Sequence, residues 1–196
     1  MSKKITILGI DPALANTGIA VMRFNLETSE LELDALSLLE TAPSKDGKKV
    51  RKSSDDLDRM LTLHAGVQGA ISMFSPAFVV AEVPSGTQSA RASFSNGGCC
   101  MMLAAVQYVV PLIQVSPTEV KVASVGHKHA AKEEMIEWAV GKYPAAQWLT
   151  VKRKGQMELV AKNEHLADAV AAVHAGIKTQ QFLSAAAVLR SIRAAA

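Results

Sequence analysis

The sequence predicts an α/β protein in which a mixed five-stranded central sheet is flanked by helices on both faces. Three observations lead to this fold class: three consecutive strand-like runs open the chain, helical and strand-like segments then alternate, and helices close it. The chain has 196 residues, of which 49% are hydrophobic and 20% are charged. This composition is typical of a globular protein with ample core material. We therefore expect a single domain over residues 1–196, with a core at about 4–176 and a C-terminal helix at 179–193.

The first part of the chain predicts three antiparallel strands. Apolar runs at 4–10 and 17–25 predict the first two, and residues 25–29 suit a hairpin connection. Partial alternation at 30–39 predicts the third strand. Residues 42–52 hold a proline, a glycine and five basic residues against one acid, so we expect an exposed loop there.

The middle of the chain alternates between helix and strand. Ser53 to Asp56 supplies an N-cap and first-turn acids for a helix. That helix carries one apolar stripe, made of Leu57, Met60, Leu61, His64, Val67 and Ile71. The following segments are predicted as a buried strand at 77–81, a mobile loop or irregular helix start at 85–95, an apolar helix at 98–110 and a strand at 112–115.

The last part of the chain is mostly helical. Helices are predicted at 118–125, 131–143, 164–175 and 179–193. Residues 144–162 have no clear pattern, although they include the basic run Lys152-Arg153-Lys154.

The charge, the cysteine spacing and the apolar runs of the chain indicate which partners and which compartment to expect. The net charge of +3 and a pI near 8.9 are compatible with a nucleic-acid partner but do not establish one. Cys99 and Cys100 are adjacent in an apolar stretch, a spacing that fits neither a disulfide framework nor a metal site, so we expect packed thiols in a reducing cytoplasm. Neither a signal peptide nor a membrane span is evident.

Four residues form a candidate metal site. Asp11 follows the first apolar strand, Glu82 ends the fourth, and His165 and Asp168 lie three residues apart on a predicted helix. Carboxylates and imidazole are ligands for divalent cations, and phosphodiester hydrolysis is a common use of such sites. Each residue also has an ordinary structural interpretation: Asp11 in a turn, Glu82 as a solvated strand end, and the helical pair as first-turn polar residues.

Five motifs in order resemble the RuvC-like Holliday junction resolvases, which have the ribonuclease H fold. The resemblance covers about residues 5–176. The matching segments are Gly9 to Ala13 with Thr17-Gly18, Val79 to Glu82, Pro117 to Lys121, Gly126 with Lys132, and Asp168-Ala169.

This resemblance implies a metal-dependent, structure-selective endonuclease that resolves Holliday junctions and leaves 5′ phosphates. It implies that Asp11, Glu82, His165 and Asp168 are the catalytic and metal-binding residues, with one or two Mg²⁺ ions that Mn²⁺ can replace. By the same resemblance, Lys121 and Lys132 contact DNA phosphates, and Arg91, Lys128 and the 152–154 run are further candidates. The implied partners are four-way and other branched DNA and a second copy of the chain.

Departures from the family pattern indicate a branch within it. Ala13 replaces the commonest glycine, and His165 stands where some members have aspartate. The basic loop at 42–52 and the tail beyond Gly176 resemble the phage-encoded branch, in a bacterial host cytoplasm. The alternatives are therefore a debranching nuclease without junction specificity or an RNA-processing relative on the same fold. An actin-like ATPase is disfavoured, because such proteins usually need more than about 300 residues.

Overall fold

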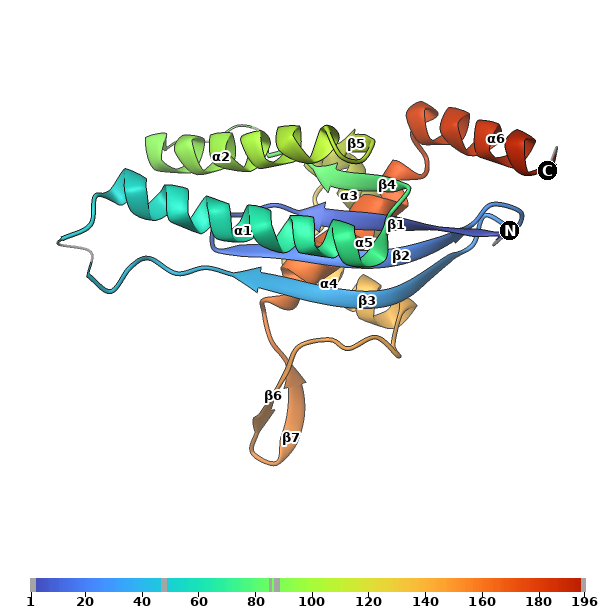
Figure 1. Cartoon of the computed structure of the whole chain (residues 1–196). Helices are drawn as coiled ribbons and strands as arrows, with labels where there is room; N and C mark the ends of the chain where they lie inside the picture. Colours follow the sequence, from blue (N-terminus) through green and yellow to red (C-terminus); the bar gives the residue numbers. More distant parts are fainter. Residues whose placement is uncertain (1–2, 47–48, 85, 87–88, 195–196) are drawn as a thin grey trace.

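The computed structural model of the chain describes residues 3–46, 49–84, 86 and 89–194. Within these residues a mixed five-stranded sheet has the order β3-β2-β1-β4-β5 (Figure 1). Its strands are β1 (Lys4–Asp11), β2 (Asn16–Asn25), β3 (Leu31–Glu40), β4 (Phe78–Glu82) and β5 (Leu112–Val115). The first three pair antiparallel, whereas β4 runs parallel to both β1 and β5. The predicted mixed sheet is confirmed.

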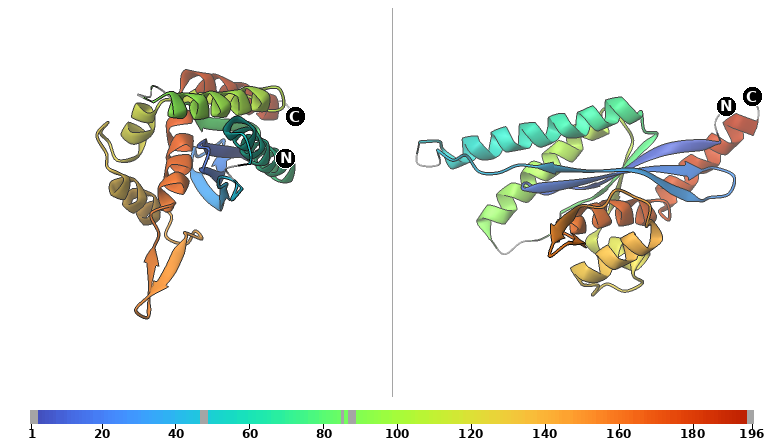
Figure 2. Two further views of the ribbon diagram at one scale, coloured as in Figure 1. Left: turned by 90° about the vertical axis from the view of Figure 1, so that its left-hand side faces the viewer. Right: turned by 90° about the horizontal axis from the view of Figure 1, so that it is seen from below.

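Helices cover both faces of this sheet, as predicted (Figure 2). One face carries α1 (Lys52–Phe74) and α2 (Ala90–Gln107). The other carries α5 (Asn163–Gly176), and α3 (Pro117–Ser124) and α4 (Lys132–Lys142) pack against that helix. The last helix, α6 (Gln180–Ala194), inserts Phe182 edge-on against Phe24 and Phe78.

The alternation of side chains along the strands divides the core into two layers. Leu8 and Ile10 of β1 pack toward α1 and α2, whereas Ile5 and Ile7 pack toward α5. Asp11 continues the second series, so its side chain belongs to the α5 face. The same alternation in β4 puts Glu82 on the face of Phe78 and Val80.

Two strand glycines allow α5 to approach the sheet closely. A Cβ atom on Gly9 would lie 2.0 Å from the carbonyl oxygen of Ala169, and one on Gly18 would lie 2.0 Å from that of His165. No side chain larger than hydrogen fits at either position unless the helix moves. The glycines in the first motif therefore position the helix that carries His165 and Asp168.

Three sequence predictions on the α1–α2 face are wrong. Leu57 and Leu61 are exposed, because the inward positions of that part of α1 are taken by Asp55, Asp56 and Arg59. Helix α2 begins at Ala90 rather than near 98, since Ser89 caps it by accepting a hydrogen bond from the backbone of Ala92. Cys99 is buried as expected, but Cys100, about 100° further round the helix, is exposed.

Two further segments complete the comparison with the sequence. Residues 144–162 contain a two-stranded hairpin of β6 (Thr150–Arg153) and β7 (Gln156–Leu159) that periodicity did not indicate. The predicted connection at 85–95 lies partly outside the described residues, which omit 85, 87 and 88. In the part of the chain that is described, no helix is both long and apolar enough to cross a membrane.

Candidate active site

Two strand ends bring Asp11 and Glu82 side by side. Strands β1 and β4 are adjacent and parallel, and their last register pair joins Ile10 to Ala81. Asp11 and Glu82 are the next residues of the two strands. Because both belong to the α5 face, their carboxylates point into the same space at the carboxyl end of the sheet.

The first turns of α5 complete the cluster. Gly18 pairs with Asp11 across β1 and β2, and the backbone of His165 lies against the space where Gly18 lacks a side chain. His165 Nδ1 is 2.6 Å from Asp11 Oδ2, with the imidazole 17% and the carboxylate 14% exposed. Asp168 lies three residues further along the helix, on the same side as His165, and is partly buried.

The acids in this cluster repel one another. Burial, with the negative charges of Asp11 and Asp168, raises the pKa of Glu82 to about 8. Burial, with the charge of Asp11, likewise raises the pKa of Asp168 to about 7. The charge of Lys121 opposes both shifts. The site therefore concentrates negative charge in a largely dry space, which is the condition that favours binding of a cation.

The same surroundings favour the charged form of His165. Burial by itself lowers the pKa of the imidazole, but the hydrogen bond and negative charge of Asp11, with the charges of Glu164 and Asp168, raise it overall. Glu164 Oε1 lies 3.5 Å from His165 Nε2. The other carboxylate oxygen, Oε2, forms a 2.7 Å ion pair with Lys132 Nζ. Glu164 was not among the residues predicted from the sequence, although its place next to His165 on α5 was a usable signal.

The four predicted DNA-binding residues lie in different surroundings. Lys121 on α3 is close enough to Glu82 and Asp168 for its positive charge to oppose the rise in their pKa values. Lys132 begins α4 and is paired with Glu164 at the edge of the site. Lys128 is exposed in the connection between those helices. Arg91, by contrast, lies on the other face of the sheet and bonds to the buried carboxylate of Asp56.

The donor set suits a hard divalent cation. Three carboxylates and an imidazole are ligand types that Mg²⁺ and Mn²⁺ accept, and a cation would offset the burial and the mutual repulsion that raise the pKa values of Glu82 and Asp168. Within the described residues, no three histidine, cysteine or acidic side chains converge closely enough to enclose an ion as they stand. Asp11 is turned to His165 instead, so cation binding would require the carboxylates to rotate toward a common point.

Comparison with known proteins places the chain among junction-cleaving enzymes. The sequence profile of the family described as crossover junction endodeoxyribonuclease RuvC matches residues 7–174. The crossover junction endodeoxyribonuclease RuvC of Parasynechococcus marenigrum is 30% identical over 135 residues, which are 67% of this chain and 79% of that protein. The profile match spans both strand ends and the first turns of α5.

Solved structures with the same fold include RuvC of Thermus thermophilus in complex with a Holliday junction substrate. That structure has a TM-score of 0.62 and 24% identity, and the match covers 87% of this chain and 92% of the Thermus chain. The yeast mitochondrial Holliday junction resolvase Ydc2 has a TM-score of 0.58 and 18% identity, covering 91% and 80%. These likenesses confirm the ribonuclease H-like α/β fold that the motifs predicted.

Proposed function

The chain belongs to the RuvC family of crossover junction endodeoxyribonucleases, and from this membership we propose that it hydrolyses phosphodiester bonds at four-way DNA junctions. The observation that carries the proposal is the convergence of Asp11, Glu82, His165 and Asp168 at one end of the sheet. A buried group of carboxylates has little use in a binding protein for DNA, because it repels phosphate. It suits a catalytic centre that holds a cation against the backbone of the DNA.

Mg²⁺ is the cation we propose, with Mn²⁺ as a substitute. Asp11, Glu82 and Asp168 would hold it, because carboxylate oxygens are its preferred protein ligands. When bound, it supplies an activated water and neutralises charge on the scissile phosphate and the departing 3′ oxygen, which leaves a 5′ phosphate. One or two ions are compatible with four ligands.

His165 acts either as a ligand or as the base that takes the proton of the attacking water. Its Nδ1 is engaged by Asp11, which fixes the ring and leaves Nε2 for a ligand or a proton. Glu164 lies near Nε2 and is itself held by Lys132, so the orientation of the ring is supported from both sides. Imidazole can exchange protons near neutral pH, as this role requires.

Lys121, Lys132 and Lys128 form the basic border of the site, and we propose that they contact DNA phosphates. All three come from the α3–α4 region, which packs on α5 beside the acids. Such contacts position a duplex without reading its sequence. Arg91 has a structural partner in Asp56, and its role toward DNA stays a prediction.

A second copy of the chain is the partner we propose for the groove between α1 and α2. Leu57 and Leu61 of α1 and Phe94 and Met101 of α2 line this groove, and each is more than half exposed. Cutting two symmetric strands of a junction needs two active sites, and a two-fold dimer supplies them. Leu61→Glu should yield monomers by light scattering, whereas Met73→Glu, at an exposed site elsewhere on α1, should not. Dimers that survive Leu61→Glu would exclude this surface.

The remaining predictions concern the setting of the enzyme. A phage-encoded nuclease in the bacterial cytoplasm is compatible with the free thiols of Cys99 and Cys100. The main alternative to a paired-cut resolvase is a general debranching nuclease.

Cleavage of a defined set of substrates tests the proposal. End-labelled four-way, three-way, single-stranded and linear duplex DNA are incubated with the protein and Mg²⁺, and the ends of the products are identified. We expect paired cuts in the four-way junction with 5′ phosphates. Equal cutting of three-way DNA, with uncoupled nicks, would establish the debranching nuclease instead. Cleavage of none of these DNAs would refute the proposal.

A further inference from the structure

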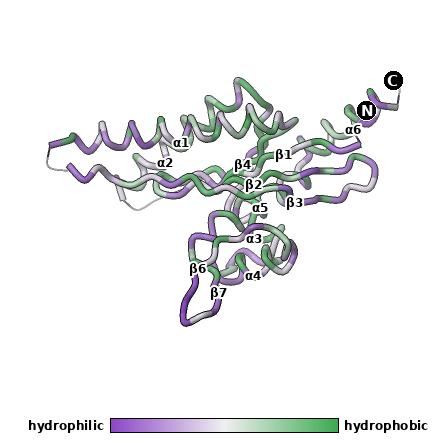
Figure 3. Tube along the Cα trace, turned by 60° about the horizontal axis from the view of Figure 1, so that its bottom comes forward, coloured by the Kyte–Doolittle hydropathy of each residue, from purple (hydrophilic) through white to green (hydrophobic). Residues whose placement is uncertain are grey.

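The β6–β7 hairpin is the largest feature that the active site does not explain. All eight of its strand residues are exposed, and it projects away from the body of the protein (Figures 1 and 2). It is also predominantly hydrophilic along its length (Figure 3). A ribbon that contributes nothing to the core needs another reason to be held in a defined place.

Hydrogen bonds at its base fix the hairpin to the helix of the active site. Asn163 is fully buried; its amide donates to the carbonyl of Leu149 at 2.8 Å and accepts from the backbone N–H of Leu149 at 2.9 Å. The N–H of Val160 donates to the same carbonyl and closes the base. Asn163 is also the first residue of α5, two residues before His165. The hairpin therefore has a set position beside the catalytic cluster.

Positive charge occupies both faces and the tip of the ribbon. The cross-strand pairs place Lys152 with Met157 on one face and Arg153 with Gln156 on the other. Lys154 lies in the two-residue turn, where it and Gly155 both have positive φ, as a type I′ turn requires. Residues 150–159 hold these three cations against one acid, Glu158, which lies 3.9 Å from Arg153. A ribbon that lay flat on a surface would need cations on one face only.

The dimensions of the hairpin match a groove of DNA. From its base at Leu149 to its tip at Lys154 the ribbon extends five residues, or roughly 17 Å at about 3.3 Å per residue. That length corresponds to about five base pairs at 3.4 Å each. The major groove, about 12 Å wide, admits a two-stranded ribbon and has phosphates along both walls.

We propose that the β6–β7 hairpin enters the major groove of the duplex arm next to the scissile phosphate, with its three basic residues facing phosphates on both strands. The inference rests on the proposed function, since binding of the scissile phosphate at the active site fixes the position of the DNA arm. The hairpin would supply a second contact that holds the DNA arm in register with Asp11 and His165, and it would not recognise individual bases. The exposed Val151 and Met157 offer the competing use, a protein contact, which the test must separate.

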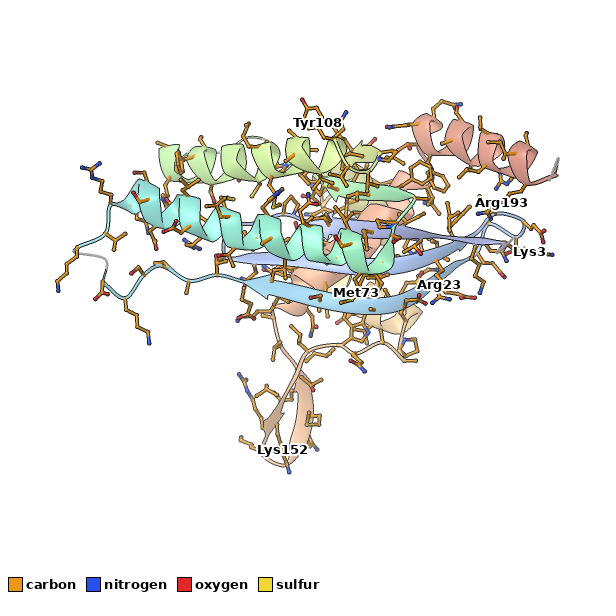
Figure 4. The ribbon with its side chains drawn as sticks, in the orientation of Figure 1. Lys3, Arg23, Met73, Tyr108, Lys152 and Arg193 are labelled. Atoms are coloured by element: carbon orange, nitrogen blue, oxygen red, sulfur yellow. The ribbon has the colours of Figure 1, made fainter. Side chains whose placement is uncertain are left out.

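A charge-removing variant with an intact turn provides the test. Lys152→Thr and Arg153→Thr keep residues suited to strands, and Lys154→Asn creates the Asn-Gly pair that type I′ turns prefer. The matched control removes the same charge through Lys3→Thr, Arg23→Thr and Arg193→Gln, three residues that lie together away from the hairpin (Figure 4). Binding of the full-length proteins to a four-way junction and to linear duplex is measured over a range of salt concentrations.

The hairpin variant should show a salt dependence of log K reduced by about two to three units of slope, since each lost phosphate contact removes about 0.9. Its affinity should fall on the order of tenfold or more at low salt, and the control should change little. Methylation at guanine N7, which lies in the major groove, should interfere with wild-type binding about five base pairs from the cut and not with variant binding.

Three results would overturn the inference. The first is a slope of log K against log salt that changes no more in the hairpin variant than in the control. The second is an absence of N7 interference in the arms of the wild-type complex. The third is loss of dimers in light scattering of the hairpin variant, which would assign the ribbon to a protein contact. Failure of the proposed function has a different signature: the wild type would cut no branched DNA, whereas the slope measured on linear duplex would still report on the hairpin.

Discussion

A single methyl group at Gly18 should displace α5, the helix that carries His165 and Asp168. In Gly18→Ala the new Cβ would lie 2.0 Å from the carbonyl oxygen of His165 and 2.5 Å from its carbonyl carbon, whereas ordinary contact begins at 3.4 Å. The obstacle is backbone, so no rotamer change relieves it, and the first turn of α5 must retreat by about 1 Å. A misplacement of that size can reduce the rate by roughly 10²-fold.

Single-turnover cleavage of a four-way junction, with thermal unfolding measured in parallel, tests this prediction. Gly176→Ala is the matched control, because its Cβ would lie 2.6 Å from a methyl group of Val80 at the other end of the same helix. Both variants should lose about 1–3 kcal/mol of stability through overpacking. Gly69→Ala, which has open space around the new Cβ, should be as stable as the wild type or more so.

The rate separates the two ends of α5. We expect Gly18→Ala to cut slowly with junction affinity retained, and Gly176→Ala to cut at nearly the wild-type rate. A folded Gly18→Ala protein with wild-type kinetics would refute the claim that the close approach of α5 positions the site. So would an equal loss of rate in both variants, because the effect would then be general destabilisation.

Three further outcomes follow from individual contacts. His165→Ala should lower the cleavage rate by roughly 10²-fold, the scale of a lost base, and His165→Asp should recover part of it in the same assay. Burial beside Tyr143 lowers the pKa of His174 from 6.5 to about 4, so the unfolded chain takes up a proton first as the pH falls. Stability from this residue is complete above pH 6.5 and is lost toward pH 4, by up to about 3 kcal/mol, and His174→Gln should remove that dependence in denaturant unfolding. Arg91→Ala should lower the melting temperature measured by thermal unfolding, because it removes a partner of the buried Asp56.

Much of the sheet was predictable because its strands are buried on both faces. Apolar runs such as 4–10 and 77–81 have few alternative structures, and the end of the first run placed Asp11 at the end of the sheet. The convergence of the four site residues was expected from the resemblance to a known family. The roles of these residues, and of the four candidate DNA contacts, stay predictions.

Other features depended on contacts that a sequence pattern does not reveal. The apolar spacing of Leu57 and Leu61 predicted burial, but the ion pairs of Asp56 with Arg59 and Arg91 occupy the inward side of α1. The hairpin at 150–159 has strands of only four residues, and alternation is limited to Gln156–Leu159, so its best signal was the Lys154-Gly155 turn. The contact of Glu164 with Lys132 arises only when α4 packs against α5.

The central claim is that the converging acids form a cation-dependent nuclease site, and junction cleavage by Asp11→Asn tests it most directly. Wild-type and variant proteins are compared at saturating occupancy of a four-way junction, with Mg²⁺ and with excess EDTA. We predict that wild type cuts only with Mg²⁺, and that the variant binds the junction at least as tightly but makes no cut. An Asp11→Asn protein that cuts at the wild-type rate, or wild-type cleavage that persists in EDTA, would contradict the account.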